Sequence, residues 1–265
     1  MTPPLSTFDF VYARPRPLAE SAASATTELG PIGLAELNEL AELHTRVDRK
    51  YIVDEHMLER LLADHRDLSV LEIDGRRQFA YESVYFDTEG FELHRAAATD
   101  RRRRFKVRTR LYADSGVTAL EVKAKDGQAR TVKHRLDYDT ADRHRLTEVG
   151  REFVDFHAMA AGFAERLAPV LTTRYVRSTL VDVAGGSRST FDSGLVCTDT
   201  DGSAVSLDRV IIETKSDGPA GPIDRWLWHH GVRPIKLSKY CTTLVQLRPE
   251  LPSNKWHRTI HRYFR

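Results

Sequence analysis

Cysteines and long apolar segments are both scarce in this sequence, and their scarcity excludes several kinds of protein. Cys197 and Cys241 are the only cysteines, and neither stands in a CxxC or histidine spacing that would bind zinc. No apolar run approaches the roughly 20 residues needed to span a bilayer, and the first residues lack the basic and apolar regions of a signal peptide. We therefore expect a cytoplasmic protein that reaches a membrane only through a partner, with both cysteines in the core.

An excess of charge is absent as well, because 40 basic residues are balanced by 38 acidic residues, for a net charge of +2. An anion would have to be attracted by a local cluster of cations rather than by the bulk charge. The sequence also has no GxxxxGK[ST] phosphate loop and no GxGxxG turn after a strand. No Ser-His-Asp arrangement has motif support, so no protein nucleophile is indicated.

Charged and apolar side chains alternate in strand-like segments between about residues 102 and 215. In residues 104–111, Lys106, Arg108 and Arg110 project to one face of a strand and apolar side chains project to the other. The same alternation recurs in residues 120–125, 132–136 and 211–215. These charged faces either meet inside a closed barrel or spread over an outer surface, and alternation alone does not decide between the two.

The chain is expected to divide into a flexible N-terminal arm at residues 1–30, one domain at 31–250 and a basic C-terminal tail at 251–265. Within the domain, Asp54 fits the N-cap of a helix, because its carboxylate can accept backbone N–H groups there. A longer amphipathic helix is predicted over residues 141–166. Strands and helices are therefore mixed along the chain.

Five short motifs occur in a fixed order: Arg46-Val47-Asp48-Arg49-Lys50-Tyr51, Tyr85-Phe86-Asp87-Thr88, Lys106-Val107-Arg108-Thr109-Arg110, Glu213-Thr214-Lys215 and Lys236-Leu237-Ser238-Lys239-Tyr240. Over about residues 44 to 247, the ordered set resembles the vacuolar transporter chaperone (VTC) polyphosphate polymerase domain, a branch of the triphosphate tunnel metalloenzymes. The resemblance implies an α+β fold in which an antiparallel β-barrel of about eight strands forms a tunnel capped by helices. The charged faces would then point into the tunnel.

The resemblance also implies that basic side chains in the tunnel contact phosphate oxygens. Arginine can bridge two oxygens of one phosphate, whereas lysine acts as a compact point charge. Arg174 and Arg177 compete for one position in the family pattern, and Arg177 fits it better. The predicted phosphate-binding residues are Lys50, Lys106, Arg108, Arg110, Lys123, Lys125, Lys133, Arg135, Arg177, Arg188, Lys215, Lys236 and Lys239.

Glu213 is the strongest candidate for a Mn²⁺ or Mg²⁺ ligand, with Asp48 and Glu121 assisting from neighbouring strands. The alternative for Glu213 is a salt bridge to a tunnel cation. Hydrolytic members of the superfamily often begin with Glu-x-Glu-x-Lys, whereas this chain has Arg46-x-Asp48-x-Lys50. The basic first position resembles the polymerase branch, and Asp in place of Glu is one methylene shorter.

The implied reaction transfers the γ-phosphoryl group of ATP to a growing inorganic polyphosphate chain and releases ADP. Glu213 would hold the metal, Arg108, Arg110 and Arg177 would hold phosphates, and Lys239 would orient the terminal group. Two alternatives use the same tunnel, namely hydrolysis of triphosphate or short polyphosphate and binding of polyphosphate without turnover. A third, nucleic-acid binding through residues 101–104 and the tail, ranks below these, and no nucleic-acid partner is expected.

Overall fold

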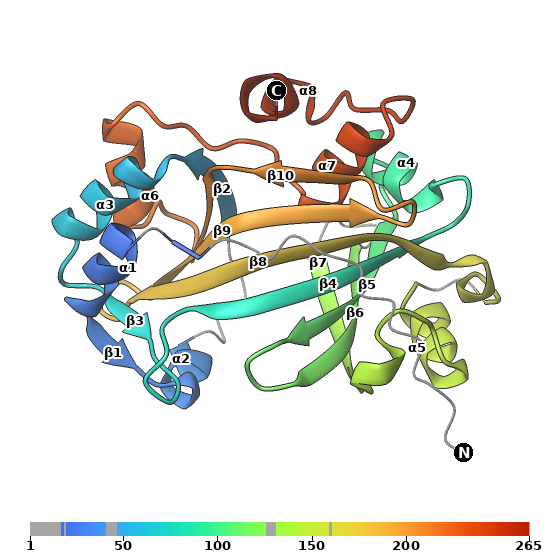
Figure 1. Cartoon of the computed structure of the whole chain (residues 1–265), viewed down its shortest axis with the longest axis horizontal. Coiled ribbons are helices and arrows are strands. Elements are labelled where there is room, and N and C mark those ends of the chain that lie inside the picture. Colours follow the sequence, from blue (N-terminus) through green and yellow to red (C-terminus); the bar gives the residue numbers. More distant parts are fainter. Residues whose placement is uncertain (1–16, 19, 41–46, 126–130, 159–160, 265) are drawn as a thin grey trace, which may run out of the picture.

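A strongly curved antiparallel sheet organises the chain (Figure 1). The computed structural model describes residues 17–18, 20–40, 47–125, 131–158 and 161–264. Within them the main path of the sheet runs, in spatial order, through β2 (Val47–Val53), β11 (Val210–Ser216), β9 (Ser187–Asp199), β8 (Ala168–Asp182), β4 (Phe79–Asp87), β5 (Arg104–Tyr112), β6 (Val117–Lys125) and β7 (Thr131–Tyr138). Three short strands extend it, namely β1 (Gly30–Ile32), β3 (Ser69–Leu71) and β10 (Ala204–Leu207).

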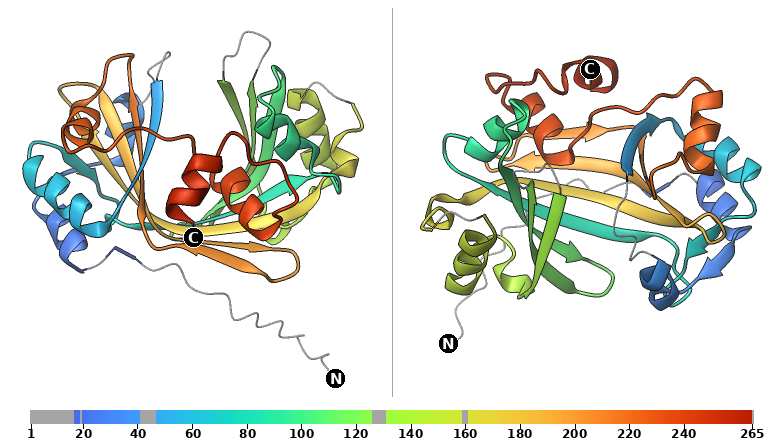
Figure 2. Two further views of the ribbon diagram at one scale, coloured as in Figure 1. Left: turned by 90° about the horizontal axis from the view of Figure 1, so that it is seen from above. Right: turned by 180° about the vertical axis from the view of Figure 1, so that it is seen from behind.

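The sheet forms a trough, which Figure 2 shows from above, with β2 in one wall, β5 to β7 in the other, and β4 and β8 across the base. The predicted α+β class with about eight antiparallel strands is confirmed. The sheet is not closed, however, because β2 and β7 end its path and do not pair with each other in the described part of the chain. A barrel requires that its first and last strands share a ladder.

Helices α1 (Glu20–Thr27), α3 (Glu55–Asp64) and α6 (Pro222–His229) cover the outer face near β2, β11 and β9. The predicted cap of α3 is confirmed, because the Asp54 carboxylate accepts a hydrogen bond from the backbone N–H of Met57. Residues 20–27 were assigned to a flexible arm, but Ala22 is buried with Leu58 of α3. This part therefore belongs to the packed domain.

A second group of helices covers the outer face of β4 to β6. It contains α4 (Glu92–Ala98), α5 (Glu148–Ala158) and the 3₁₀ turn η2 (Ala164–Arg166), and another 3₁₀ turn, η1 (Thr140–Asp142), precedes α5. The helix predicted over 141–166 is thus shorter than expected. The Thr147 hydroxyl accepts the N–H of Gly150 at its start, and the Asp155 carboxylate accepts two N–H groups of the chain that turns away after it.

Helix α7 (Lys239–Leu247) packs inside the trough at one end, against Ile52, Tyr85 and Ile211. Both cysteines lie in this cluster, buried and unpaired, as predicted. Helix α8 (His257–Tyr263) packs beside it, so these residues of the predicted tail are folded rather than free, and α2 (Leu34–Leu40) lies near β1 and β3. None of the helices in the described ranges is long and apolar enough to cross a membrane.

Candidate functional site

The inner face of the trough carries the alternating charged side chains. Cross-strand partners lie on the same face of a sheet, and the register pairs Glu213 with Lys50, Lys215 with Asp48, and Arg108 with Glu121. The outer face carries the residues between them, which pack under the helices. By this register the inner face includes Asp48, Lys50, Lys106, Arg108, Arg110, Glu121, Lys123, Lys125, Lys133, Arg135, Arg177, Arg188, Glu213 and Lys215.

The two walls of the trough face each other across a shared space. Lys123 lies on β6, and Glu213 and Lys50 lie on the opposite wall. The pKa of Lys123 is lowered, mainly because the surrounding protein disfavours its charge; Glu213 acts to raise this pKa and Lys50 acts to lower it. The Lys123 side chain is nevertheless accessible to water. The register places Lys50 and Lys123 on the same, concave face of the sheet, so the walls present their charges to a common interior.

Asp192 joins two of the predicted phosphate-binding residues at the base of the trough. Its carboxylate accepts two hydrogen bonds from Arg177, from Nε at 2.6 Å and from Nη2 at 2.8 Å, and a third from Nζ of Lys239. Burial opposes ionisation of Asp192, but Arg177 and Lys239 hold its pKa at about 2. Asp192 was not among the residues predicted from the sequence. A signal was present, because Asp192 and Arg188 lie an even number of residues apart on β9 and therefore on the same face of the strand.

A second carboxylate, that of Glu121, is held by cations on the opposite wall. Its Oε2 atom accepts hydrogen bonds from Nε and Nη2 of Arg108 at 2.8 and 2.6 Å, and its Oε1 atom accepts one from Nζ of Lys133 at 2.7 Å. Burial would raise the pKa of Glu121, but Arg108, Arg110 and Lys133 hold it well below its usual range. Both oxygens are therefore occupied by ion pairs.

Tyrosine rings fix the guanidinium groups of the lining. Arg108 donates from Nη1 to the hydroxyl of Tyr85 at 3.1 Å, and Arg110 donates from Nη2 to the hydroxyl of Tyr175 at 2.9 Å. The guanidinium carbon of Arg177 lies 5.3 Å from the centre of the Tyr175 ring, a distance typical of cation–π contacts. Cations held in this way present donors to a ligand without a further loss of side-chain freedom.

Glu213 forms the salt bridges that the alternative interpretation of this residue expects, since Oε1 lies 3.6 Å from Nζ of Lys50 and 3.4 Å from Nζ of Lys215. Burial would raise the pKa of Glu213, but Lys215 and Lys50 hold it well below its usual range. Burial also lowers the pKa of Lys215 to about 8. The carboxylate is thus ionised and 16% exposed toward the interior.

The three predicted metal ligands do not converge on one point. Within the described part of the chain, no group of three or more His, Cys, Asp or Glu side chains could hold a metal ion. Glu121 is occupied by Arg108 and Lys133, whereas Asp48 and Glu213 lie on adjacent strands and both act on the pKa of Lys215. Mg²⁺ is usually bound by one or two carboxylates together with substrate phosphates. Glu213 and Asp48 fit that donor set, and Glu121 does not.

Lys106 and Lys236 lie near α7 and α8. Lys106 donates to the hydroxyl of Ser238, the N-cap of α7, at 2.9 Å. Lys236 is exposed, and its backbone carbonyl accepts a hydrogen bond from the hydroxyl of Thr259 in α8 at 2.9 Å, so it lies beside α8 rather than among the strands. Arg46 of the first motif lies outside the described residues.

Arg174 and Arg177, the two candidates for one position in the family pattern, project from opposite faces of β8. Arg174 pairs in register with Glu82, to which its Nε donates at 2.7 Å, on the outer face of the sheet. Arg177 projects to the inner face and binds Asp192 there. The fold therefore brings Arg177, and not Arg174, to the other predicted residues.

Other motif residues have structural contacts outside the trough. Tyr51 and Thr214 each donate from a hydroxyl to Oδ1 of the buried Asp224 at 2.6 Å, which ties β2 and β11 to α6. Asp87 accepts hydrogen bonds from the backbone N–H of Thr88, from two N–H groups in the first turn of α4 and, at 2.5 Å, from the hydroxyl of Tyr240 in α7. These contacts explain why the motifs contain more than the lining residues.

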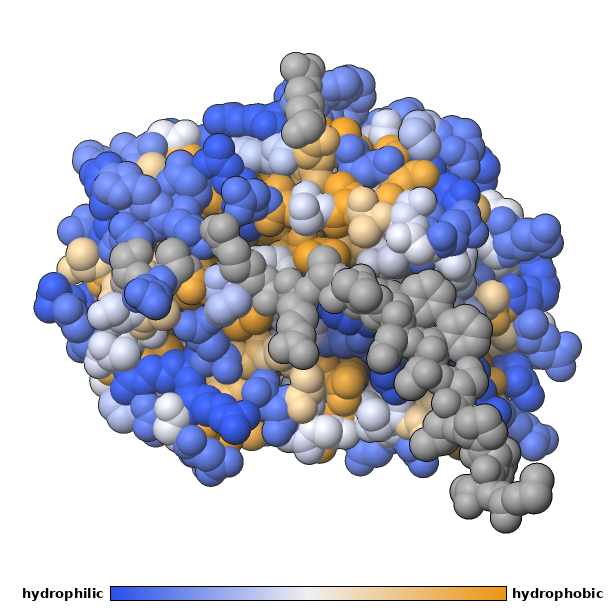
Figure 3. Space-filling view, in the orientation of Figure 1, coloured by the Kyte–Doolittle hydropathy of each residue, from blue (hydrophilic) through white to orange (hydrophobic). Residues whose placement is uncertain are grey.

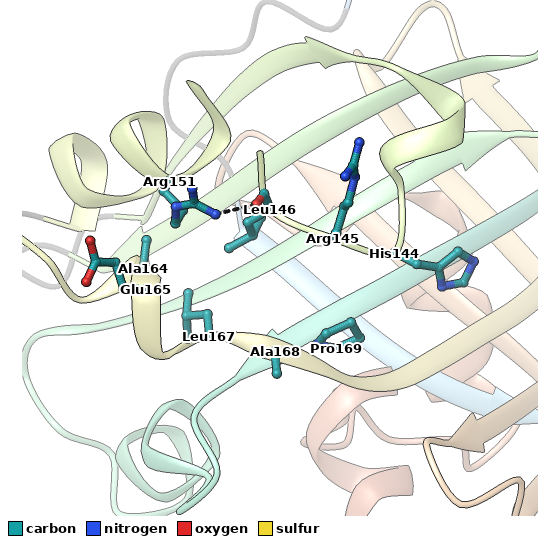
Figure 4. Close-up of a pocket in the computed structure, with 9 residues that line it drawn as sticks. All are labelled: His144, Arg145, Leu146, Arg151, Ala164, Glu165, Leu167, Ala168 and Pro169. Atoms are coloured by element: carbon teal, nitrogen blue, oxygen red, sulfur yellow. Dashed lines mark hydrogen bonds between the residues drawn. The ribbon is translucent and has the colours of Figure 1, made fainter. Parts of the chain in front are cut away.

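A separate cavity of about 470 Å³ lies on the outer side of the sheet (Figure 4). It lies between the start of β8, η2 and the chain before α5, and Arg151 donates to the carbonyl oxygen of Leu146 at its rim at 2.8 Å. Its lining includes none of the residues predicted from the sequence to bind phosphate or metal. The outer surface seen in Figure 3 is otherwise a mixture of hydrophilic and apolar residues.

The fold is similar to that of several solved structures at low sequence identity. Solved structures with a similar arrangement include a putative adenylyl cyclase from Hippeastrum described as having a dominant triphosphatase activity, at 15% identity and a TM-score of 0.49, which covers 78% of this chain and 97% of that one. A protein from Pyrococcus horikoshii has 15% identity and a TM-score of 0.44, with 77% and 98% of the two chains covered. A search of curated proteins finds no match. The family profile described as the VTC domain matches residues 45–248, and the chain therefore belongs to the VTC domain family.

Proposed function

We propose that this chain is a polyphosphate polymerase, which transfers the γ-phosphoryl group of ATP to the end of a growing inorganic polyphosphate chain and releases ADP. Membership of the VTC domain family supports a polyphosphate-related function. The observation that carries the proposal is the trough itself, in which both walls carry cations on the concave face of the sheet. A long flexible polyanion fits such a lining better than a compact ligand does.

Phosphoryl transfer needs positioned cations more than it needs a protein nucleophile, because negative charge spreads over the equatorial oxygens in the transition state. Arg108 and Arg110, which are held by tyrosine hydroxyls, would grip phosphates along β5. Arg177 and Lys239, which are held together by Asp192, would orient the terminal group. Their fixed positions would stabilise the developing charge without reorganisation.

Glu213 and Asp48 are the residues that would hold Mn²⁺ or Mg²⁺. When bound, the ion would neutralise charge on the β- and γ-phosphate oxygens and so make phosphoryl transfer easier. Lys50 and Lys215, which contact Glu213, would then be released to bind phosphate instead.

Hydrolysis of triphosphate or short polyphosphate is a second candidate, and one observation favours it. The sheet does not close between β2 and β7 in the described part of the chain, and an open side would admit water to a bound γ-phosphate more easily than a closed barrel would. The same residues would bind the substrate in both reactions.

Incubation of the purified protein with ATP and either Mn²⁺ or Mg²⁺ separates these activities. The proposal predicts ADP together with acid-labile polyphosphate, and a short polyphosphate primer should remove any lag. Phosphate release without chain growth would favour the hydrolase. Tight polyphosphate binding without any turnover would favour a binding protein.

A further inference from the structure

A partly apolar surface lies at the end of the trough opposite α7. Tyr112 is the last residue of β5, where the chain turns into β6, and its ring is half-buried. Its cross-strand partner Val117 is 45% exposed. Figure 1 shows this hairpin below the long strands and α7 above them, at opposite ends of the trough. Binding of phosphate oxygens requires cations and N–H donors, and neither an exposed valine nor an aromatic ring supplies them.

A guanidinium group accompanies this surface. Arg135 on β7 donates from Nη1 to the hydroxyl of Tyr112 at 3.3 Å, and its guanidinium carbon lies 5.2 Å from the centre of the Tyr112 ring. The side chain of Arg135 is 40% exposed. Nucleobases stack on aromatic rings, tyrosine among them, and on arginine guanidinium planes.

A row of tyrosines leads from this surface into the trough. Tyr81 pairs in register with both Tyr112 and Tyr175, and the ring centres of the two pairs are 5.2 and 5.4 Å apart. Tyr81 and Tyr175 contact Arg110 and Arg177, so their role is to position those cations. Tyr112 lies at the outer end of the row and is not needed for that purpose.

The spacing along β5 suits a ligand with a flat head and an anionic tail. Alternate residues of a strand point to the same face and lie about 7 Å apart, so Arg110 and Arg108 follow Tyr112 inward along one line. Lys239 contacts the ring of Tyr175 from the α7 side. A head at Tyr112 would therefore direct an attached phosphate chain toward Arg110, Arg108 and the inner end of the trough.

We propose that Tyr112, Arg135 and Val117 form a subsite for the base of a nucleoside triphosphate, which orients the substrate with its γ-phosphate inward. The inference rests on the proposed function, since it assigns a role to the nucleoside part of ATP. The base stacks on the Tyr112 ring and the Arg135 guanidinium, and Val117 packs against its edge. The subsite distinguishes ATP, as phosphoryl donor, from polyphosphate, which has no base.

The test compares ATP with tripolyphosphate, which carries the phosphates without the nucleoside. Tyr112→Leu removes the ring and keeps an apolar side chain, whereas the matched control Tyr112→Phe keeps the ring and loses only the hydroxyl. Calorimetric titration of both ligands into the wild type and both variants gives the affinities, and thermal unfolding checks that each variant is folded. Tyr112→Leu should weaken ATP binding about 5- to 100-fold, the loss expected for one base–aromatic stack, with tripolyphosphate unchanged and Tyr112→Phe within about twofold for both ligands.

Each other outcome has a definite meaning. Equal weakening of ATP and tripolyphosphate by Tyr112→Leu, or no weakening of either, would overturn the base subsite while leaving the polymerase proposal intact. A selective loss of ATP affinity in a protein that makes no polyphosphate would support the subsite and refute the polymerase. Failure of the wild type to bind either ligand would overturn both proposals.

Discussion

Replacement of Asp192 by Asn tests the electrostatics of the trough most directly. The carboxylate is fully buried, and its partners Arg177 and Lys239 are only 14% and 13% exposed. Asn preserves the shape of the side chain but removes the negative charge, so two cations lose their counterion at once. Breaking a buried ion pair by removing one partner typically costs about 3 to 5 kcal/mol. We expect the free energy of unfolding of Asp192→Asn to fall by about that amount.

The same substitution should have the opposite effect on polyphosphate binding. A polyanion can replace the missing counterion of Arg177 and Lys239, and one charge-assisted contact corresponds to roughly tenfold or more in affinity. Asp192→Asn should therefore bind polyphosphate roughly tenfold more tightly. Turnover should nevertheless fall by roughly 10- to 100-fold, because misplaced groups lose the benefit of orientation.

The pH dependence of stability gives an independent check on Asp192. The pKa of its carboxyl is depressed in the folded chain, from 3.8 to about 2, so the wild type gains stability from this group above pH 4. That contribution, about 2 to 3 kcal/mol, should be lost as the pH falls from about 4 to 2 and should be missing from Asp192→Asn.

Urea unfolding, polyphosphate titration and ADP release measure the three effects on one protein preparation. Asp137→Asn is a suitable control, because that side chain is also on the sheet but is 93% exposed. We expect it to change stability by less than about 0.5 kcal/mol. Unaltered stability and unaltered polyphosphate affinity in Asp192→Asn would refute the assignment of Asp192 as the shared counterion.

Three further predictions concern the lining. Replacement of Arg108 and Arg110 together by Ala should weaken polyphosphate binding roughly 10- to 100-fold or more in a folded protein; unchanged affinity by titration would place this face of β5 outside the site. Glu213→Gln should nearly abolish metal-dependent transfer, because an amide is a poor ligand for Mn²⁺, yet polyphosphate should still bind; full turnover with reduced thermal stability would instead show a salt-bridge role. Polyphosphate affinity should fall as the pH rises through about 8, where Lys215 loses its proton, whereas Lys215→Arg, whose side chain stays charged, should lack this step in a titration series from pH 7 to about 9.5.

Much of the local structure was determined by the sequence alone. Period-two alternation separated Arg108 from the apolar Val107, and the structure places the first on the inner face and the second in the core under α4 and α5. The cap at Asp54 was equally local, because its partner is the N–H of Met57 three residues away. Patterns of this kind depend on backbone geometry over a few residues, so they can be predicted without knowledge of the rest of the fold.

Which face became the interior was not determined by local pattern. Alternation fixes only that Arg108 and Val107 point in opposite directions, whereas helices from distant parts of the chain pack on the Val107 face and leave the Arg108 face to line the trough. The resemblance to the VTC domain supplied that information, and it also suggested closure, which the described residues do not show. The end of α5 likewise depended on contacts of Asp155 beyond the helix.

The pairing of charges was decided by tertiary structure. Asp192 and Lys239 are 47 residues apart in the sequence and meet only because α7 packs into the trough beside β9. Glu121 was predicted as a metal ligand from its strand, but the register of β5, β6 and β7 surrounds it with Arg108 and Lys133. A carboxylate's role depends on which cations reach it, and that is set by contacts between distant segments rather than by the residue's own neighbours.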